Sequence, residues 1–240
     1  MPFDILCISD NYNNIQEGDK KMIIFPKPRE ISELKNLQVS YNSKNRDNVR
    51  ILVIDDSDFA PLERLQKLNF NIRQEKDISN IYLVAEYDVI LVDIDGIGLL
   101  LNETYQGAYV ISEIRKQYPQ KVIIAYTSKT YDASYNKYFR LADYVFKKDI
   151  ASEDWSENLD SAIENAINPI SCWKKLRDFL LEKEVSLQTL IRIEDEYVKS
   201  ITEKRTVNYS GEKWKKMLGK EIHDILLNFV SSLIFKYMGL

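Results

Sequence analysis

From residue 49 to residue 167 the sequence alternates short, largely apolar runs with longer segments of helical period. The apolar runs cover residues 49–54, 70–72, 89–92, 122–126 and 144–146. The segments between and after them, with apolar residues at i, i+3 and i+4 spacing, are residues 59–68, 78–86, 108–117, 131–141 and 155–167. Parallel strands that are apolar almost throughout are buried on both faces. The pattern therefore predicts an α/β fold, a doubly wound domain with a five-stranded parallel sheet between layers of helices.

Two further regions flank this domain, so we expect three parts: residues 1–48, 49–168 and 169–240. The N-terminal extension has two apolar stretches that favour strands, residues 3–9 and 22–25, followed by Pro26 and Pro28, which interrupt regular structure. Polar turn-forming residues at 41–48 connect it to the domain. In the last part, the spacing of apolar residues predicts amphipathic helices at 172–181, 185–202 and 214–237, with a break at 206–211.

The composition excludes several classes of protein. Of the 240 residues, 45% are hydrophobic and 29% are charged, with a net charge of -4, which is typical of a globular chain and argues against one built to coat nucleic acid. No apolar run approaches the ~18 to 20 residues of a membrane span, and the N-terminus lacks a secretory pattern, so we expect a cytoplasmic protein without a membrane. Cys7 and Cys172 are too few for a disulfide framework or a thiolate metal site.

The residues that carry chemistry stand where the apolar runs end. In a doubly wound sheet, ligands bind outside the carboxyl ends of the strands. An aspartate after a strand is, taken alone, better explained as a helix cap, and a lysine there as a solvated side chain, so the hypothesis depends on four strand ends in the right order. These ends are Asp55-Asp56, Asp93-Ile94-Asp95-Gly96, Thr127-Ser128 and Lys147-Lys148.

This set of residues indicates a magnesium site that handles phosphate. Three carboxylates at one sheet edge repel one another unless a cation lies between them, and hard oxygen ligands suit Mg²⁺. Thr127 and Lys147 offer a hydroxyl and a cation for phosphate oxygens at the same edge. A carboxylate held there can accept a phosphoryl group.

Residues 49–168 resemble the receiver domain of response regulators, the switch proteins of two-component signalling. The resemblance lies in four strings: Ile-Leu-Val-Ile-Asp-Asp at 51–56, Tyr-Asp-Val-Ile-Leu-Val-Asp at 87–93, Val-Ile-Ile-Ala-Tyr-Thr-Ser at 122–128, and Ala-Asp-Tyr-Val-Phe-Lys at 142–147. It implies a flavodoxin-like sheet and a switch that is not primarily an enzyme.

The resemblance also implies a role for each site residue. Asp93 is the phosphoacceptor, and Mg²⁺ is bound by Asp55, Asp56, Asp93 and the backbone carbonyl of Asp95. Thr127 and Tyr144 are the switch residues, the second being the aromatic side chain that moves inward when Thr127 engages phosphate. Lys147 pairs with the phosphoryl group. For Tyr144, simple packing on the last strand explains the residue equally well.

Two features depart from the family pattern. The loop after Asp93, from Gly96 to Gly107, is longer and more apolar than usual, which suits a loop that covers the site or binds a partner. Lys148 stands where the family usually has a proline, normally cis, so we expect no cis bond at this turn. Both departures leave open a degenerate receiver that acts as a phosphorylation-independent interaction module.

A second resemblance offers a different function. Ile-Leu-Val-Asp-Ile-Asp-Gly at 90–96 is similar to the first motif of haloacid-dehalogenase-type phosphohydrolases, in which Asp93 is the nucleophile and Asp95 the general acid and base. Thr127 and Lys147 then serve as the second and third motifs. The final acidic pair of that family, on a further strand after the lysine, is missing.

The helical tail is the expected output region. Its apolar stripe of Ile222, Ile225, Leu226, Phe229, Leu233 and Tyr237 favours packing on Trp214, on the other tail helices, or in a homodimer. No helix-turn-helix is apparent, so DNA is a disfavoured partner. Lys-Glu-Ile-His-Asp at 220–224 resembles the phosphoacceptor box of histidine kinases, which makes His223 a candidate for phosphotransfer, although a lone helical histidine is more often structural.

Together these observations predict a cytoplasmic response regulator. Its receiver accepts phosphate at Asp93 in a Mg²⁺-dependent reaction from a histidine kinase, a phosphotransfer protein or a small phosphodonor. The phosphorylated receiver then changes its association with a partner or with the tail. The alternatives are the degenerate receiver and the phosphohydrolase.

Overall fold

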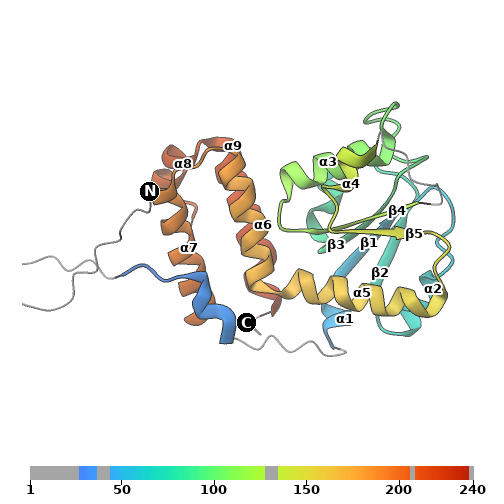
Figure 1. Ribbon diagram of the computed structural model, residues 1–240, viewed down its shortest axis with the longest axis horizontal. Helices are drawn as coiled ribbons and strands as arrows, with labels where there is room; N and C mark the ends of the chain where they lie inside the picture. The colour runs from blue at the N-terminus through green and yellow to red at the C-terminus, as the bar shows by residue number, and fades with distance from the viewer. Residues whose placement is uncertain (1–26, 37–43, 128–134, 206–208, 238–240) are drawn as a thin grey trace, which may run out of the picture.

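The computed structural model describes residues 27–36, 44–127, 135–205 and 209–237, and its centre is a parallel sheet (Figure 1). The strands are β1 (Arg50–Ile54), β2 (Asn71–Glu75), β3 (Val89–Asp93), β4 (Val122–Thr127) and β5 (Tyr144–Lys147). Their order is β2-β1-β3-β4-β5, and every neighbouring pair is parallel. The predicted five-stranded, doubly wound α/β domain is confirmed. The strands expected at 3–9 and 22–25 lie outside the described residues.

Helices cover both faces of the sheet because strand side chains alternate between two buried clusters. One cluster joins Ile51, Val53 and Leu91 to α2 (Leu62–Lys67) and α5 (Ser152–Ile167). The other joins Leu52 and Ile90 to η2 (Ile81–Glu86), α3 (Gln106–Gln117) and α4 (Asn136–Phe139). β3 is buried along its whole length, as a central strand between two helical layers must be.

Several observed helices differ in type or length from those predicted by the spacing of apolar residues. Residues 78–86, expected as an α-helix, contain the 3₁₀ helix η2, whose N-cap Asn80 accepts a hydrogen bond from the Tyr82 amide. α2 begins at Leu62 rather than at residue 59, because Phe59 packs into the core before the helix starts. α4 is a single turn, and residues 131–134 of the expected helix lie outside the described residues.

The C-terminal residues form a separate helical module with its own apolar core. It contains α6 (Pro169–Glu182), α7 (Leu187–Thr202), α8 (Glu212–Leu218) and α9 (Lys220–Tyr237). The helix expected at 214–237 is in fact two helices, because Gly219 has φ +75 and ends α8. Ile225, Leu226 and Phe229 of the predicted stripe are buried inside this module.

Part of the N-terminal extension belongs to the same helical module. η1 (Ile31–Asn36) packs on α6 and α7, and its Leu34 is buried in their core. The Ile31 amide donates to Glu194 Oε1 at 2.8 Å, and the Arg29 amide donates to Asp195 Oδ1 at 2.9 Å. By contrast, α1 (Lys44–Asn48) packs on α5 and β2. Of the described residues of this extension, η1 therefore belongs to the helical module and α1 to the α/β domain.

The two parts meet where α5 is followed by α6 (Figure 1). The carboxylate of Asp143 also links them. Asp143 directly precedes β5 and forms ion pairs of 2.8 Å with Arg115 of α3 and with Lys175 of α6. Beside it lies a cavity of about 270 Å³, lined among others by Arg140 and Phe179. None of the described helices combines the length and the apolar character that crossing a bilayer requires.

Candidate functional site

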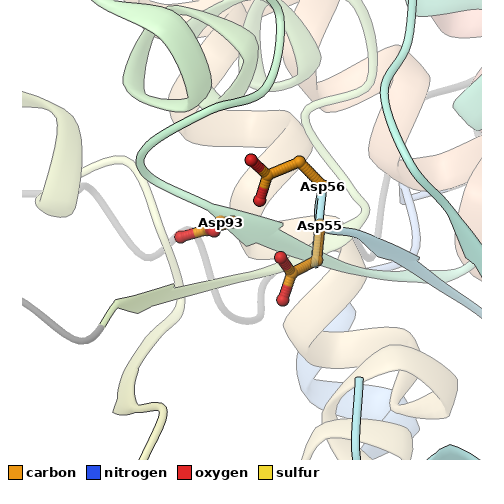
Figure 2. Close-up of side chains that lie close together, drawn as sticks. All are labelled: Asp55, Asp56 and Asp93. Carbon is orange, nitrogen blue, oxygen red and sulfur yellow. The ribbon is translucent and has the colours of Figure 1, made fainter. Parts of the chain in front are cut away.

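The ends of β1 and β3 bring three aspartates together. Asp55 and Asp56 follow β1, and Asp93 is the last residue of β3, the neighbouring strand. Each of the three offers a carboxylate oxygen within 4.8 Å of the others (Figure 2). Asp55 and Asp93 are 3% and 4% exposed, whereas Asp56 is exposed. The convergence follows from the parallel sheet, which places all strand ends at one edge.

Local backbone geometry holds the acidic residues in place. The Asp55 amide donates to Glu75 O at 3.1 Å, and Asp55 Oδ1 accepts the Ser57 amide at 2.9 Å. Gly96 has φ +81, and a Cβ there would lie 2.4 Å from Asp56 Oδ2. A side chain at position 96 would therefore require both a strained backbone and a shift of the Asp56 side chain.

The lysine at the carboxylates is Lys148, one residue after the predicted Lys147. Lys148 Nζ lies 2.5 Å from Asp93 Oδ2 and 3.1 Å from Asp55 Oδ2. Strand side chains alternate, so Lys148 follows Phe146 on the face covered by α5, whereas Lys147 is exposed on the other face. The Lys148 amide also donates to Thr127 O at 3.1 Å, which extends the pairing of β4 and β5 by one residue.

Tyr126 is a site residue that the periodicity did not reveal. It precedes Thr127 on β4 and is 1% exposed, and its hydroxyl donates to Asp55 Oδ2 at 2.5 Å. Lys148 Nζ lies 5.1 Å from the centre of its ring. Within an apolar run the tyrosine resembles a core residue. A buried tyrosine hydroxyl needs a hydrogen-bond partner, however, so a tyrosine next to a strand end could have been recognised from the sequence as a candidate site residue.

The charges at this edge are strongly coupled. Burial alone would raise the pKa of Asp55, but hydrogen bonds from Tyr126, the Ser57 amide and Lys148 outweigh burial and lower it. For Asp93, burial prevails over Lys148 and raises the pKa, and the charge of Asp55 acts in the same direction. Burial lowers the affinity of Lys148 for its proton, yet its bonds to Asp93 and Asp55 raise its pKa overall. A second cation near Asp93 and Asp55 would relieve their mutual repulsion.

The donor set fits a hard divalent cation. All three ligands are carboxylates, two of them are buried, and their oxygens are close enough to share one ion. Mg²⁺ and similar ions take oxygen ligands and keep coordinated waters, which the exposed side of Asp56 can accommodate. The arrangement is therefore suited to binding a divalent ion and a phosphate at the same sheet edge.

The remaining predicted residues lie in different surroundings. Thr127 ends β4 at this edge and is 9% exposed. The Asp95 amide approaches Asp93 Oδ1 at 3.4 Å, so the loop turns around the Asp93 carboxylate. Tyr144 lies on β5 and contacts α5, where its hydroxyl donates to Ser161 O at 3.4 Å and accepts from Asn165 Nδ2 at 3.2 Å.

His223 belongs to the core of the helical module. It is 5% exposed, and its Nε2 lies 2.7 Å from Tyr209 O. Because a carbonyl can only accept, Nε2 must carry the proton in this bond. A phosphoryl group could not reach this nitrogen without opening the module, and the geometry therefore favours the structural role of this histidine.

The loop between β3 and α3 is anchored at several points. The Gly96 amide donates to Gln106 Oε1 at 2.7 Å, and the Gly98 amide donates to Asp77 Oδ1 at 2.5 Å. Ile97 is buried, whereas Leu100 is 82% exposed. The peptide bonds of the described residues are all trans, including the one after Lys147.

The strand order 2-1-3-4-5, with helices on both faces, is that of response-regulator receiver domains. The α/β domain has the receiver fold. Solved structures similar to this chain include a receiver domain protein of Methanospirillum hungatei, with 18% identity, a TM-score of 0.41 and coverage of 49% of this chain and 95% of that one. A Thermotoga maritima response regulator in complex with Mg²⁺-BeF has 24% identity and a TM-score of 0.39, with coverage of 48% and 98%.

A longer protein shares the same likeness over a smaller part of its length. NtrX of Brucella abortus, in complex with ATP, has 18% identity and a TM-score of 0.43, and the match covers 58% of this chain and 30% of that one. No family model and no curated protein matches the sequence.

Proposed function

We propose that this protein is a response regulator in which Asp93 accepts a phosphoryl group in a Mg²⁺-dependent reaction. The observation that carries the proposal is the cluster of Asp55, Asp56 and Asp93 at the carboxyl edge of the sheet, with Lys148 bridging Asp55 and Asp93. An acidic cluster alone has many explanations. Here Lys148 is bound to Asp93, and its positive charge can stabilise the negative charge of a phosphoryl group.

The residues divide the work of transfer as follows. A carboxylate oxygen of Asp93 attacks phosphorus, a new P–O bond forms, and the donor leaves with the electrons of the broken bond. Asp55 and Asp56 would hold Mg²⁺, which when bound neutralises charge on the phosphoryl oxygens. Lys148 exchanges its contact with Asp93 for one with the phosphoryl group, and Thr127 offers its hydroxyl from the end of β4.

The donor in this proposal is another molecule, either a histidine kinase, a phosphotransfer protein or a small phosphodonor. His223, the only histidine of the chain, is buried with Nε2 bound to Tyr209 O. We place this exchange in the cytoplasm, as the sequence predicts. Slow loss of the phosphoryl group to water would complete the cycle without making the protein primarily an enzyme.

Output in this proposal passes along β5. Lys148 follows this strand at the phosphate edge, and Asp143 precedes it at the opposite edge, where Lys175 of α6 is bound. A shift of Lys148 toward a phosphoryl group would therefore act on the strand that holds the helical module. The predicted homodimer through the tail stripe stays a prediction, and the burial of Ile225, Leu226 and Phe229 within the module removes one reason for it.

One observation favours the degenerate module as a second candidate. Asp55 Oδ2 already accepts hydrogen bonds from Tyr126 and Lys148, which leaves this carboxylate partly satisfied without a metal. The phosphohydrolase has less support, because in the described residues helices follow β5 and no further strand carries its final acidic pair.

Incubation with acetyl phosphate and Mg²⁺, followed by intact mass measurement, tests the proposal. We expect one phosphoryl group on the wild type and none on Asp93→Asn, because an amide oxygen is too poor a nucleophile. Omission of Mg²⁺ should also prevent uptake. A phosphorylated Asp93→Asn variant would contradict the assignment of the acceptor, and no uptake by the wild type would support the degenerate module.

Turnover of an external phosphoester, such as para-nitrophenyl phosphate, separates the hydrolase from the switch. The proposal predicts that the protein does not release phosphate from such esters catalytically. Sustained release that Asp93→Asn abolishes would favour the hydrolase over the response regulator.

A further inference from the structure

The hydrogen bonds of Asp55 limit what it can offer to a metal. Its Oδ2 accepts the Tyr126 hydroxyl at 2.5 Å and Lys148 Nζ at 3.1 Å, and its Oδ1 accepts the Ser57 amide at 2.9 Å. A carboxylate oxygen has about two positions for hydrogen bonds or metal contacts. Oδ2 is therefore fully used, and Oδ1 keeps a single position.

The other two carboxylates are less engaged. Asp56 is exposed and accepts only the Ser57 hydroxyl, at 3.2 Å, among the hydrogen bonds of the described residues. Asp93 accepts Lys148 at 2.5 Å and the distant Asp95 amide at 3.4 Å. Asp55 is thus the ligand whose metal-binding capacity its neighbours reduce most.

Of the two donors on Asp55 Oδ2, only Tyr126 is fixed. Lys148 is a flexible side chain, and its charge can move to a phosphoryl group. The Tyr126 ring is buried, with edge-to-face contacts to Phe59 at 6.0 Å and to Trp155 at 6.1 Å between ring centres. The hydroxyl cannot turn away from Asp55 unless this aromatic cluster rearranges.

We propose that Tyr126 is a positioning residue that competes with a divalent cation for Asp55 and thereby weakens the metal site. The inference rests on the proposed function, because it concerns the metal that this function requires. A hydroxyl bond to Asp55 withdraws part of the negative charge that would attract the ion, and it reserves one ligand position. The site then fills only at a higher metal concentration than the three carboxylates alone would require.

Substitution of Tyr126 by phenylalanine tests this directly, because it removes the hydroxyl and keeps the ring. Mn²⁺ serves as the probe, since the electron paramagnetic resonance signal of the free ion falls when it binds, and Mg²⁺ is then added as competitor. We expect Tyr126→Phe to bind Mn²⁺ about tenfold more tightly than the wild type, the size expected for one hydrogen bond to a charged group.

Two variants control the measurement. Tyr197→Phe removes a buried hydroxyl of the helical module, which donates to Pro169 O at 2.8 Å, and should leave Mn²⁺ affinity unchanged. Asp56→Asn removes a ligand and should weaken binding in the wild-type and Tyr126→Phe backgrounds alike. If Tyr126→Phe loses its folded circular dichroism spectrum, Tyr126→Met carries the same prediction, because it fills similar space without a hydroxyl.

The outcomes separate this inference from the proposed function. If Tyr126→Phe binds Mn²⁺ more tightly than the wild type does, the result supports competition between Tyr126 and the metal. The same holds if the variant binds Mn²⁺ and the wild type shows no measurable binding. Equal or weaker binding by the variant, beside a wild type that binds, overturns the role of Tyr126 and leaves the response regulator standing. No binding by either protein overturns both proposals.

Discussion

At the scale of single residues, a side chain's position in its strand decides whether it belongs to the site. Lys147 and Lys148 are adjacent and chemically identical, yet only Lys148 lies on the α5 face with Tyr126 and reaches Asp93. Order along the chain predicted the strand end at which a lysine meets the carboxylates, but the contact is made by Lys148 and not by Lys147. The alternation of side chains that places Lys148 on the α5 face continues past β5 because the Lys148 amide donates to Thr127 O, a strand contact that a single sequence does not show.

The two lysines therefore form a matched pair for mutation. Lys148→Met should reduce the rate of phosphoryl uptake from acetyl phosphate at least about tenfold, because charge-assisted hydrogen bonds at this site are worth that much. Lys147→Met should change the rate less than about twofold, as expected of an exposed side chain. Intact mass measured over time gives both rates, and a larger loss in Lys147→Met would show that the lysines exchange roles.

At the scale of elements, the apolar pattern predicted the strands better than the helices. Buried parallel strands are apolar throughout, so residues 89–92 and 122–126 identify β3 and β4 almost to the residue. η2 and the break at Gly219 depend on local backbone geometry that the pattern ignores. The glycine was a readable signal, because a positive φ after a helix favours glycine. The packing of η1 on α7 was not readable, because it joins residues far apart in sequence.

The start of α3 is the element most tightly constrained by the site. Gly107 passes so close to β3 that a Cβ there would lie 1.8 Å from Asp93 O. Gly107→Ala should therefore destabilise the protein by about 3 kcal/mol, the upper end of the usual cost of overpacking. Urea unfolding measures the loss, and phosphoryl uptake at Asp93 should fall as well, because the backbone of the acceptor must shift.

Gly211→Ala is the control for this substitution. Gly211 precedes α8, and a Cβ there would meet nothing within 4 Å. Its cost should stay near or below about 1 kcal/mol, because alanine is only a poorer helix cap than glycine. Equal costs at the two positions would argue against the close approach of Gly107 to Asp93.

At the scale of the whole molecule, one partly buried ionic group joins the α/β domain to the helical module. Asp143 directly precedes β5, whereas Arg115 lies in α3 and Lys175 in α6, and their side chains are 13%, 20% and 17% exposed. Asp143 also accepts the Ile123 amide at 2.8 Å. Burial lowers the pKa of Lys175 despite the adjacent carboxylate, so this cation depends on Asp143 for its charge. This junction could not be predicted from the sequence, because the three residues belong to segments that meet only in the folded chain.

Asp143→Asn should therefore destabilise the folded protein by about 1 to 3 kcal/mol, because it leaves two partly buried cations without their carboxylate, although Arg115 keeps its backbone carbonyl acceptors. Thermal or urea unfolding of the full chain measures this loss. Asp178→Asn is the matched control from the same cavity. Asp178 lines the cavity, but Arg115 and Lys175 both pair with Asp143, so this substitution should leave the stability nearly unchanged. The module should also loosen from the α/β domain, which faster amide hydrogen exchange in α6 would report.

The same carboxylate predicts a pH dependence with a definite sign. Burial would raise the pKa of Asp143, but Arg115 and Lys175 outweigh burial and hold it below its ordinary value. The folded state thus binds the proton less readily than the unfolded chain, whose aspartates titrate near about 3.9. The stabilisation is complete above that value and is lost as the pH falls through the lower, folded pKa. Unfolding free energies measured from neutral pH down to about pH 3 should decline more steeply for the wild type than for Asp143→Asn, and parallel slopes would contradict the role of this group in holding the two parts together.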